Sequence, residues 1–122
     1  MAIKIEPWIT PAEQRIYNGK KAWTIGNLIA KAKDLPVKEM PLEHLNIKDL
    51  SLSFETLRDV VMNIRAVLNA DLSYPIILDE NGSVMDGRHR IAKALLEEKE
   101  TIKFVRFEKD PTPDYCLEDD EK

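Results

Sequence analysis

The stretch Met85-Asp86-Gly87-Arg88-His89-Arg90 constrains the fold of this 122-residue chain more than any other. It lies where a short strand, Ser83-Val84-Met85, is expected to turn into a helix that continues from Ile91 to Leu96. Glycine at such a turn allows the backbone of another segment to approach closely. The stretch therefore predicts a strand and a helix joined by a tight turn within one folded domain.

The same residues favour an anionic ligand. The free N–H groups of a helix start and the positive end of its dipole attract anions. Arg88, His89 and Arg90 oppose that dipole, although a sequence selected only for stability would place acids there. Asp86 is expected to cap the helix. Gly87, Arg88, His89 and Arg90 are therefore predicted to bind phosphate. The flanking arginines should lower the pKa of His89, which would then meet a phosphate as a neutral donor unless the ligand restores the proton.

Four further elements are predicted around this motif. Val37-Lys38-Glu39-Met40 alternates apolar and polar residues, as a half-buried strand does. Tyr74–Leu78 is typical of a buried strand, Asn81-Gly82 of a hairpin turn, and Thr101–Phe107 of a final strand. The clearest helix begins at about Ser53, which can cap it, and ends at about residue 70. Its apolar face is expected to consist of Leu57, Val60, Val61, Ile64, Val67 and Leu68.

The two ends of the chain differ from this middle part. Thr10-Pro11-Ala12-Glu13 favours the start of a short helix that ends before Asn18-Gly19, and a second helix is expected from Thr24 until Pro36 stops it. Prolines and acids after Glu108 predict a disordered tail. The sequence thus predicts a helical N-terminal extension (1–35), an α+β domain with a small mixed β-sheet and packed helices (36–108), and an acidic tail (109–122).

Composition restricts the class of protein. An apolar content of 43%, a charged content of 33% and a net charge of −4 suit a globular protein that does not coat polyanions. No apolar run is long enough to span a bilayer, and the N-terminus lacks the apolar region of a secretion signal. Cys116 is the single cysteine, so no internal disulfide can form, and cytoplasmic residence is expected. With two histidines and no cysteine pair, no dedicated transition-metal site is expected.

The stretch from Val37 to Phe107 resembles the ParB/sulfiredoxin-like fold in the order of its predicted elements. Gly87-Arg88-His89-Arg90 looks like the glycine-cysteine-histidine-arginine signature of sulfiredoxins, in which the histidine and the arginine belong to an ATP phosphate site. Arg88 stands at the position of the cysteine, so sulfinic acid reductase chemistry by that route is excluded. Cys116 lies in the acidic tail and is a poor replacement.

Two other branches of this fold are informative. ParB partition proteins bind nucleotide triphosphates with a related arginine-rich motif and continue into a helix-turn-helix DNA domain. This chain ends where that domain would begin, so operator recognition is not expected. Free-serine kinases resemble the motif more closely, because an aspartate-glycine pair is followed by histidine-arginine, as in Asp86-Gly87 and His89-Arg90. In those enzymes the aspartate lies at the active site, and an acid after the first strand serves as base. Glu43 and Asp49 are both near that place and remain alternatives.

The resemblance implies a nucleotide-binding domain whose ligand is ATP, ADP or CTP, with or without magnesium. Gly87, Arg88, His89 and Arg90 would hold the phosphates. Asp86 would be the catalytic residue, either as a ligand of the metal ion or as a base, in a small phosphotransferase or nucleotide hydrolase. Binding without turnover stays open.

Two alternatives belong to other classes. The first is a nucleic-acid-associated ParB-like protein, either a nuclease or a plasmid or phage partition accessory without its own helix-turn-helix domain. The negative net charge and the lack of a basic stripe with interleaved aromatic residues argue against it. The second is an interaction module that binds an acidic surface or a phosphorylated peptide. Trp8, Tyr17 and Trp23 could stack on a base, although they are expected instead to anchor the N-terminal extension.

Overall fold

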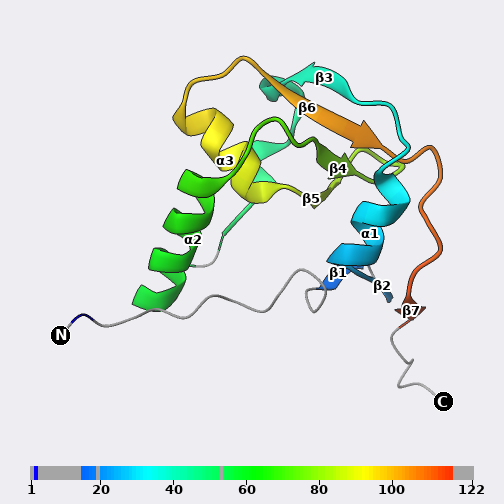
Figure 1. Cartoon of the computed structure of the whole chain (residues 1–122), viewed down its shortest axis with the longest axis horizontal. Coiled ribbons are helices and arrows are strands. Elements are labelled where there is room, and N and C mark those ends of the chain that lie inside the picture. Colours follow the sequence, from blue (N-terminus) through cyan, green and yellow to red (C-terminus); the bar gives the residue numbers. More distant parts are fainter. Residues whose placement is uncertain (1, 3–14, 19, 53, 117–122) are drawn as a thin grey trace.

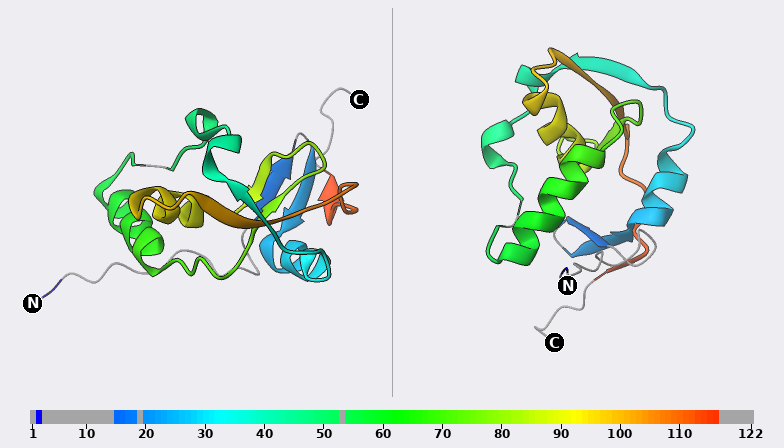
Figure 2. Two further views of the ribbon diagram at one scale, coloured as in Figure 1. Left: turned by 90° about the horizontal axis from the view of Figure 1, so that it is seen from above. Right: turned by 60° about the vertical axis from the view of Figure 1, so that its left-hand side comes forward.

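The computed structural model describes residues 2, 15–18, 20–52 and 54–116, and its elements form two small sheets with helices packed against them. Figure 1 shows α2 and α3 on one side of the molecule and α1 with the smaller sheet on the other, and the two views of Figure 2 show the same arrangement. The predicted α+β class is confirmed. In chain order the elements are β1 (Arg15–Asn18), β2 (Lys21–Thr24), α1 (Ile25–Ala32), β3 (Lys38–Pro41), η1 (Leu42–His44), η2 (Ile47–Asp49), α2 (Leu57–Asn69), β4 (Ile76–Leu78), β5 (Val84–Asp86), α3 (Arg88–Leu96), β6 (Thr101–Arg106) and β7 (Tyr115–Cys116).

The larger sheet is mixed and has the strand order β3-β6-β4-β5. β6 pairs antiparallel with β3 and parallel with β4, and β4 pairs antiparallel with β5. Both faces of this sheet are covered, which explains why β4 is apolar at every position. Ile76 and Leu78 point to one core, whereas Ile77 between them points to the other.

Each face of the sheet has its own core. On the first face, α3 and the segment after β3 bury a cluster of Leu42, Leu45, Ile76, Leu78, Ile91, Ala94 and Ile102. On the second face, β2 and α1 bury a cluster of Trp23, Leu28, Ala32, Ile77, Met85, Val105 and Phe107. β2 and α1 therefore contribute to the core of the sheet, and Trp23 is the anchor that the sequence predicts, with no exposed surface.

The hairpin between β4 and β5 has the predicted turn. Gly82 adopts a φ of 83°, a conformation that glycine reaches without steric cost. The buried carboxylate of Asp79 accepts hydrogen bonds from the backbone N–H groups of Asn81 and Ser83, both at 2.9 Å. This turn directs β5 back along β4 and thereby places Asp86 at the start of α3.

The predicted helix before Asn18 is wrong for the residues that the structure describes, because Ile16 and Tyr17 lie in strand β1. Its proposed start at Thr10 lies outside the described residues. β1 and β2 form an antiparallel pair, so local sequence preference gives way to pairing between strands. The second predicted helix is confirmed as α1. Thr24 caps it, with Oγ1 accepting a hydrogen bond of 3.2 Å from the N–H of Asn27.

The prediction of a disordered tail is wrong for residues 110–116, which we call the C-terminal strap. Its carbonyl groups accept hydrogen bonds from side chains of the N-terminal elements, at 3.2 Å from Trp23 Nε1 to Pro111 O and at 2.6 Å from Lys31 Nζ to Thr112 O. β7 then pairs antiparallel with β2. The acidic composition of this segment predicted side chains that are solvated. Asp114 instead accepts backbone and side-chain hydrogen bonds at the start of α1. Residues 117–122 lie outside the described part.

Helix α2 is present as predicted, but its buried face is not the predicted one. The cap is Thr56, whose Oγ1 accepts a hydrogen bond of 3.1 Å from the N–H of Asp59, and Ser53 lies outside the described residues. Most of the apolar face is partly or largely exposed, and Leu57, Ile64 and Leu68 are the most exposed of it. The residues buried within α2 are Met62 and Asn63. Apolar periodicity identifies a stripe on a helix, but not which surface the rest of the protein covers.

None of the helices in the described part of the chain combines the length and the apolar character needed to cross a bilayer.

Candidate functional site

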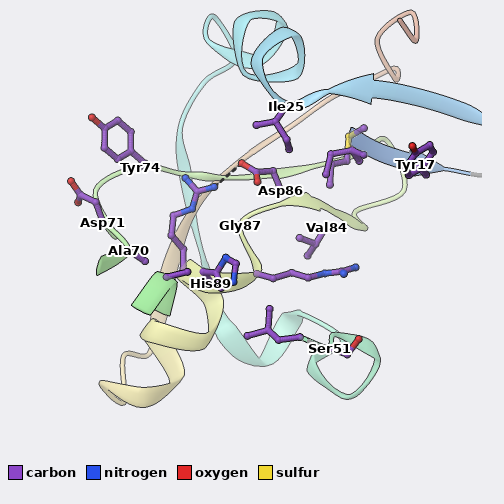
Figure 3. A pocket seen from close by; sticks show the side chains of 16 residues that line it. Tyr17, Ile25, Ser51, Ala70, Asp71, Tyr74, Val84, Asp86, Gly87 and His89 are labelled. Carbon is purple, nitrogen blue, oxygen red and sulfur yellow. Dashed lines mark hydrogen bonds and ion pairs between the residues drawn. The ribbon is translucent and has the colours of Figure 1, made fainter. Parts of the chain in front are cut away.

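A cavity of about 670 Å³ opens at the start of α3 and contains all five residues of the predicted motif. Figure 3 shows it with Tyr74 and Asp71 toward one end, Tyr17 toward the other, and Asp86 and His89 between them. Segments far apart in the sequence build its walls. They contribute Ile16, Tyr17, Ile25, Ser51, Leu52, Ala66, Ala70, Asp71, Tyr74, Val84, Met85, Asp86, Gly87, Arg88, His89 and Arg90.

Gly87 is fixed by its backbone and by its packing. Its φ is 120°, and a Cβ atom at this position would lie 2.4 Å from Cγ2 of Ile76 and 2.8 Å from Cβ of Ile76. It occupies the N-cap position of α3, where no side chain of the described residues caps the helix. The prediction that Asp86 caps α3 is therefore wrong. Glycine permits this close approach of α3 to β4, and the residues of the first turn of the helix line the cavity.

Asp86 forms an ion pair with Arg90 instead of capping the helix. The distance from Arg90 Nη2 to Asp86 Oδ2 is 2.8 Å, and the two side chains are only 19% and 24% exposed. The dashed line in Figure 3 marks this contact on the cavity wall. The sequence did not predict this contact, in which each side chain neutralises part of the other's charge. Arg90 therefore contributes less to the binding of an anion than its position in the sequence suggested.

Arg88 differs from Arg90 in its surroundings. Its side chain is exposed and lines the cavity. It makes no hydrogen bond and no ion pair to any residue that the structure describes. A guanidinium group presents several N–H donors in a planar fork that matches carboxylate and phosphate geometry. Arg88 is thus the cation of the motif that can give its full charge and its donors to a ligand.

His89 is held by a buried partner on α2. Its Nε2 lies 2.8 Å from Oδ1 of Asn63, a side chain that is only 2% exposed. Burial lowers the pKa of His89 below 6.5; the carboxylate of Asp86 acts in the opposite direction, and Arg90 lowers the pKa further. The predicted direction of this shift is confirmed, although burial is a larger cause than the arginine. The ring is neutral at physiological pH, with a fixed orientation.

Sequence reasoning missed three residues of this region. Asn63 was visible as a polar residue in the middle of an amphipathic helix, where such a side chain usually has a buried hydrogen-bond partner. Asp71 and Tyr74 lie on the loop between α2 and β4 and line the cavity. The spacing of Asp71 and Ser73 is typical of a turn stabilised by an aspartate side chain. Tyr74, directly before Pro75, is predicted from the sequence only as the first residue of a strand.

The remaining candidate residues lie elsewhere. Glu43 on η1 and Asp49 on η2 are exposed, and neither is among the described residues that line the cavity. The side-chain amide of Asn46 donates a hydrogen bond to Asp49. Cys116 is exposed on the C-terminal strap. Tyr17 lines the cavity, so the prediction that it only anchors the N-terminal segment is incomplete, and Trp8 lies outside the described residues.

Metal ligation by the protein alone is not supported in the described part of the chain, where no group of three or more His, Cys, Asp and Glu side chains is arranged to hold an ion. A nucleotide-borne magnesium ion needs only one or two carboxylates from the protein. Asp86 lines the cavity and meets that lower requirement.

Comparison of the chain with protein-family models, with curated proteins and with solved structures found no match.

Proposed function

We propose that this protein is a nucleotide-binding domain of the ParB/sulfiredoxin-like kind, which binds the phosphates of ATP, ADP or CTP at the start of α3 in the cytoplasm. The observation that carries the proposal is the combination of an uncapped helix start and an exposed arginine without a partner among the described residues, both in one cavity. The residues of the first turn of α3 line this cavity together with the side chain of Arg88, and backbone N–H groups and a guanidinium both suit phosphate oxygens.

The other groups of the cavity fit a phosphate ester. The neutral ring of His89 is held by Asn63 and lies beside the ion pair of Asp86 and Arg90. A ligand with negative charge would raise the pKa of His89 and make the ring a charged donor. A volume of about 670 Å³ is within the range of pockets that hold small organic ligands. The carboxylates of Asp71 and Asp86 in the same cavity argue against a continuous polyanion such as nucleic acid.

Asp86 is the residue for which we propose a catalytic role. Magnesium bound with the nucleotide supplies charge neutralisation at the phosphates, and the Asp86 carboxylate is the group on the cavity wall beside the motif that suits it as a ligand. Arg90 holds one oxygen of this carboxylate and so fixes its orientation. In a phosphotransferase or a nucleotide hydrolase, we propose that the same carboxylate accepts a proton from an acceptor hydroxyl or a water.

Calorimetric titration of the full chain with ATP, ADP and CTP, with and without magnesium, tests the proposal. We expect binding of at least one of them, weakened about tenfold or more in Arg88→Ala, because a hydrogen-bonded charge pair is lost. Arg58→Ala is the matched control, since Arg58 is an exposed arginine on α2 that does not line the cavity. It should bind like the wild type.

Absence of binding to all three nucleotides would refute the proposal, as would equal losses in the two arginine variants. Release of inorganic phosphate is measured in the same samples. Phosphate release that Asp86→Asn abolishes would assign a hydrolase, because asparagine retains an oxygen for Arg90 but neither the charge nor the basicity of the carboxylate. Binding without release in the presence of magnesium would exclude a nucleotide hydrolase.

A further inference from the structure

The loop between α2 and β4 is organised before any ligand arrives. The backbone N–H and the hydroxyl of Ser73 both donate to Oδ1 of Asp71, at 2.9 Å and 2.7 Å, and the N–H of Tyr74 donates to the carbonyl of Asp71 at 3.2 Å. Lys93 on α3 holds the beginning of the loop, with Nζ donating to the carbonyls of Leu68 at 3.1 Å and Ala70 at 2.7 Å. These hydrogen bonds fix the conformation of the loop, and a preorganised binding site requires such a fixed conformation.

Asp71 presents one carboxylate oxygen without a hydrogen bond. Both hydrogen bonds from Ser73 reach Oδ1, and Oδ2 has no partner among the described residues. These two hydrogen bonds lower the pKa of Asp71, so the carboxylate is charged at neutral pH. A charged acceptor at this end of the cavity repels phosphate oxygens and attracts hydroxyl or amino donors.

Tyr74 supplies an aromatic surface next to this acceptor. Its side chain is 63% exposed although it lines the cavity, and Pro75 directly after it limits the flexibility of the backbone. Aromatic rings with an open face stack on nucleobases of any identity. In Figure 3, Tyr74 and Asp71 lie together on the same side of the cavity, and Asp86 and His89 lie between them and Tyr17.

The other end of the cavity has a different character. Tyr17 and the apolar side chain of Val84 line the cavity there, and the carboxylate of Asp86 lies between this end and Asp71 (Figure 3). A ribose needs an acceptor for its hydroxyl hydrogens, and a carboxylate is the side chain commonly used for this purpose in dinucleotide-binding domains. Asp71 meets this need, and its charge excludes the phosphates from its own end.

We propose that Asp71 and Tyr74 form the nucleoside subsite of the cavity, in which the Tyr74 ring stacks on the base and Asp71 Oδ2 accepts hydrogen bonds from the ribose hydroxyls. This inference rests on the proposed binding of phosphates at the start of α3, and it makes ribonucleotides, rather than deoxyribonucleotides, the class of ligand. The nucleoside lies at the Asp71 end, and its 5′-phosphates extend toward Arg88.

Titration of the full chain with the pairs ATP and dATP, and CTP and dCTP, tests this assignment. We expect the wild type to bind the ribonucleotide about tenfold more tightly than its 2′-deoxy counterpart, because the hydroxyl that pairs with a charged acceptor is missing from the latter. Asp71→Asn keeps Oδ1 for Ser73 and replaces Oδ2 by an amide N–H₂ group. This variant should bind the ribonucleotide as weakly as the deoxyribonucleotide. Asp34→Asn, at an exposed aspartate that does not line the cavity, should keep the tenfold preference.

Tyr74 is tested with the same ligands. Tyr74→Ala should weaken the ribonucleotide and the deoxyribonucleotide by the same factor of about ten, since stacking does not involve the sugar. Tyr74→Phe should retain the wild-type affinity, because the ring and not the hydroxyl makes the contact. Circular dichroism of each variant before titration identifies any that is unfolded, and Tyr74→Phe keeps the test decisive if Tyr74→Ala is among them.

The outcomes separate the two proposals. Nucleotide binding with equal affinity for ribose and deoxyribose in the wild type overturns the subsite and leaves phosphate binding intact. A preference for ribose that persists in Asp71→Asn overturns the role of Asp71, and a loss of affinity in Tyr74→Phe equal to that in Tyr74→Ala overturns stacking. No binding of any of the four nucleotides overturns the phosphate site and the subsite together.

Discussion

The starts of helices α1 and α3 satisfy their backbone N–H groups in different ways. At α1, the Thr24 hydroxyl accepts from the N–H of Asn27, and the carboxylate of Asp114 accepts from the N–H of Thr24 at 2.6 Å. At α3, Gly87 offers no capping side chain, and the first turn carries arginine and histidine but no acid. The carboxylate at α1 complements the helix dipole, whereas the cations at α3 oppose it. At the start of α1 the protein supplies its own negative charge through Asp114, whereas the first turn of α3 contains no acid.

The largest effect is expected from the glycine at the start of α3. Gly87→Ala should lower the free energy of unfolding by about 3 kcal/mol or more, because the new Cβ atom would overlap Ile76 and the φ of 120° disfavours any side chain. Urea unfolding followed by circular dichroism measures this change. Gly26→Ala, at an exposed position in the first turn of α1, is the matched control and should stabilise the protein by up to about 1 kcal/mol. Similar losses at both glycines would contradict the difference between the two helix starts.

An acid placed at the start of α3 should make it resemble the start of α1. Arg88→Glu should raise the free energy of unfolding by about 0.3–1 kcal/mol, because a negative charge replaces a positive one in the first turn. The same change should abolish nucleotide binding in the calorimetric assay. A variant that is more stable and no longer binds would show that Arg88 is maintained for a ligand. Unchanged binding in Arg88→Glu would show that α3 has no such role.

The smallest effect is expected in the pH dependence of folding stability that His89 causes. Burial lowers its pKa in the folded protein below the ordinary value of 6.5, so the unfolded chain binds the proton more readily. Stability should therefore decline as the pH falls from about 6.5 through the lower folded pKa, and it should be fully recovered above about 6.5. Thermal unfolding midpoints between pH 7.5 and 5 should fall less in His89→Gln than in the wild type. Parallel slopes in the two proteins would contradict the burial of an uncharged ring.

Local patterns predicted the elements of the larger sheet and its helices. Alternation located β3 and β6, the Asn81-Gly82 turn located the hairpin, and a glycine before cationic residues located the start of α3. These features depend on residues that are close in sequence, and sequence periodicity reports such neighbours directly. Asp86 and Arg90 are also close in sequence, but their ion pair was not predicted. Asp86 ends a strand and Arg90 lies in the following helix, so helical spacing does not apply to the pair.

Contacts between distant segments could not be predicted in the same way. The pairing of β2 with β7 joins residues that are about ninety positions apart, and no local pattern in the strap indicates a partner. The exposed apolar side of α2 shows the same limit, since the packing of the whole protein decides which face is covered. Asp71 and Tyr74 joined the candidate site for the same reason, because the fold brings their loop to the start of α3.

The C-terminal strap affects the order in which the protein assembles. β4 and β6, with α3 between them in the sequence, can associate after a short loop is closed, whereas the contacts of Trp23 with Pro111 and of Ala22 with Asp114 require closure across most of the chain. Closing a longer loop costs more entropy and slows the contacts that depend on it. The wall of the cavity that carries Tyr17 belongs to the hairpin that this strap holds. During folding, the end of the cavity at the start of α3 should therefore form first, and the wall that carries Tyr17 should be completed in the last, rate-limiting step.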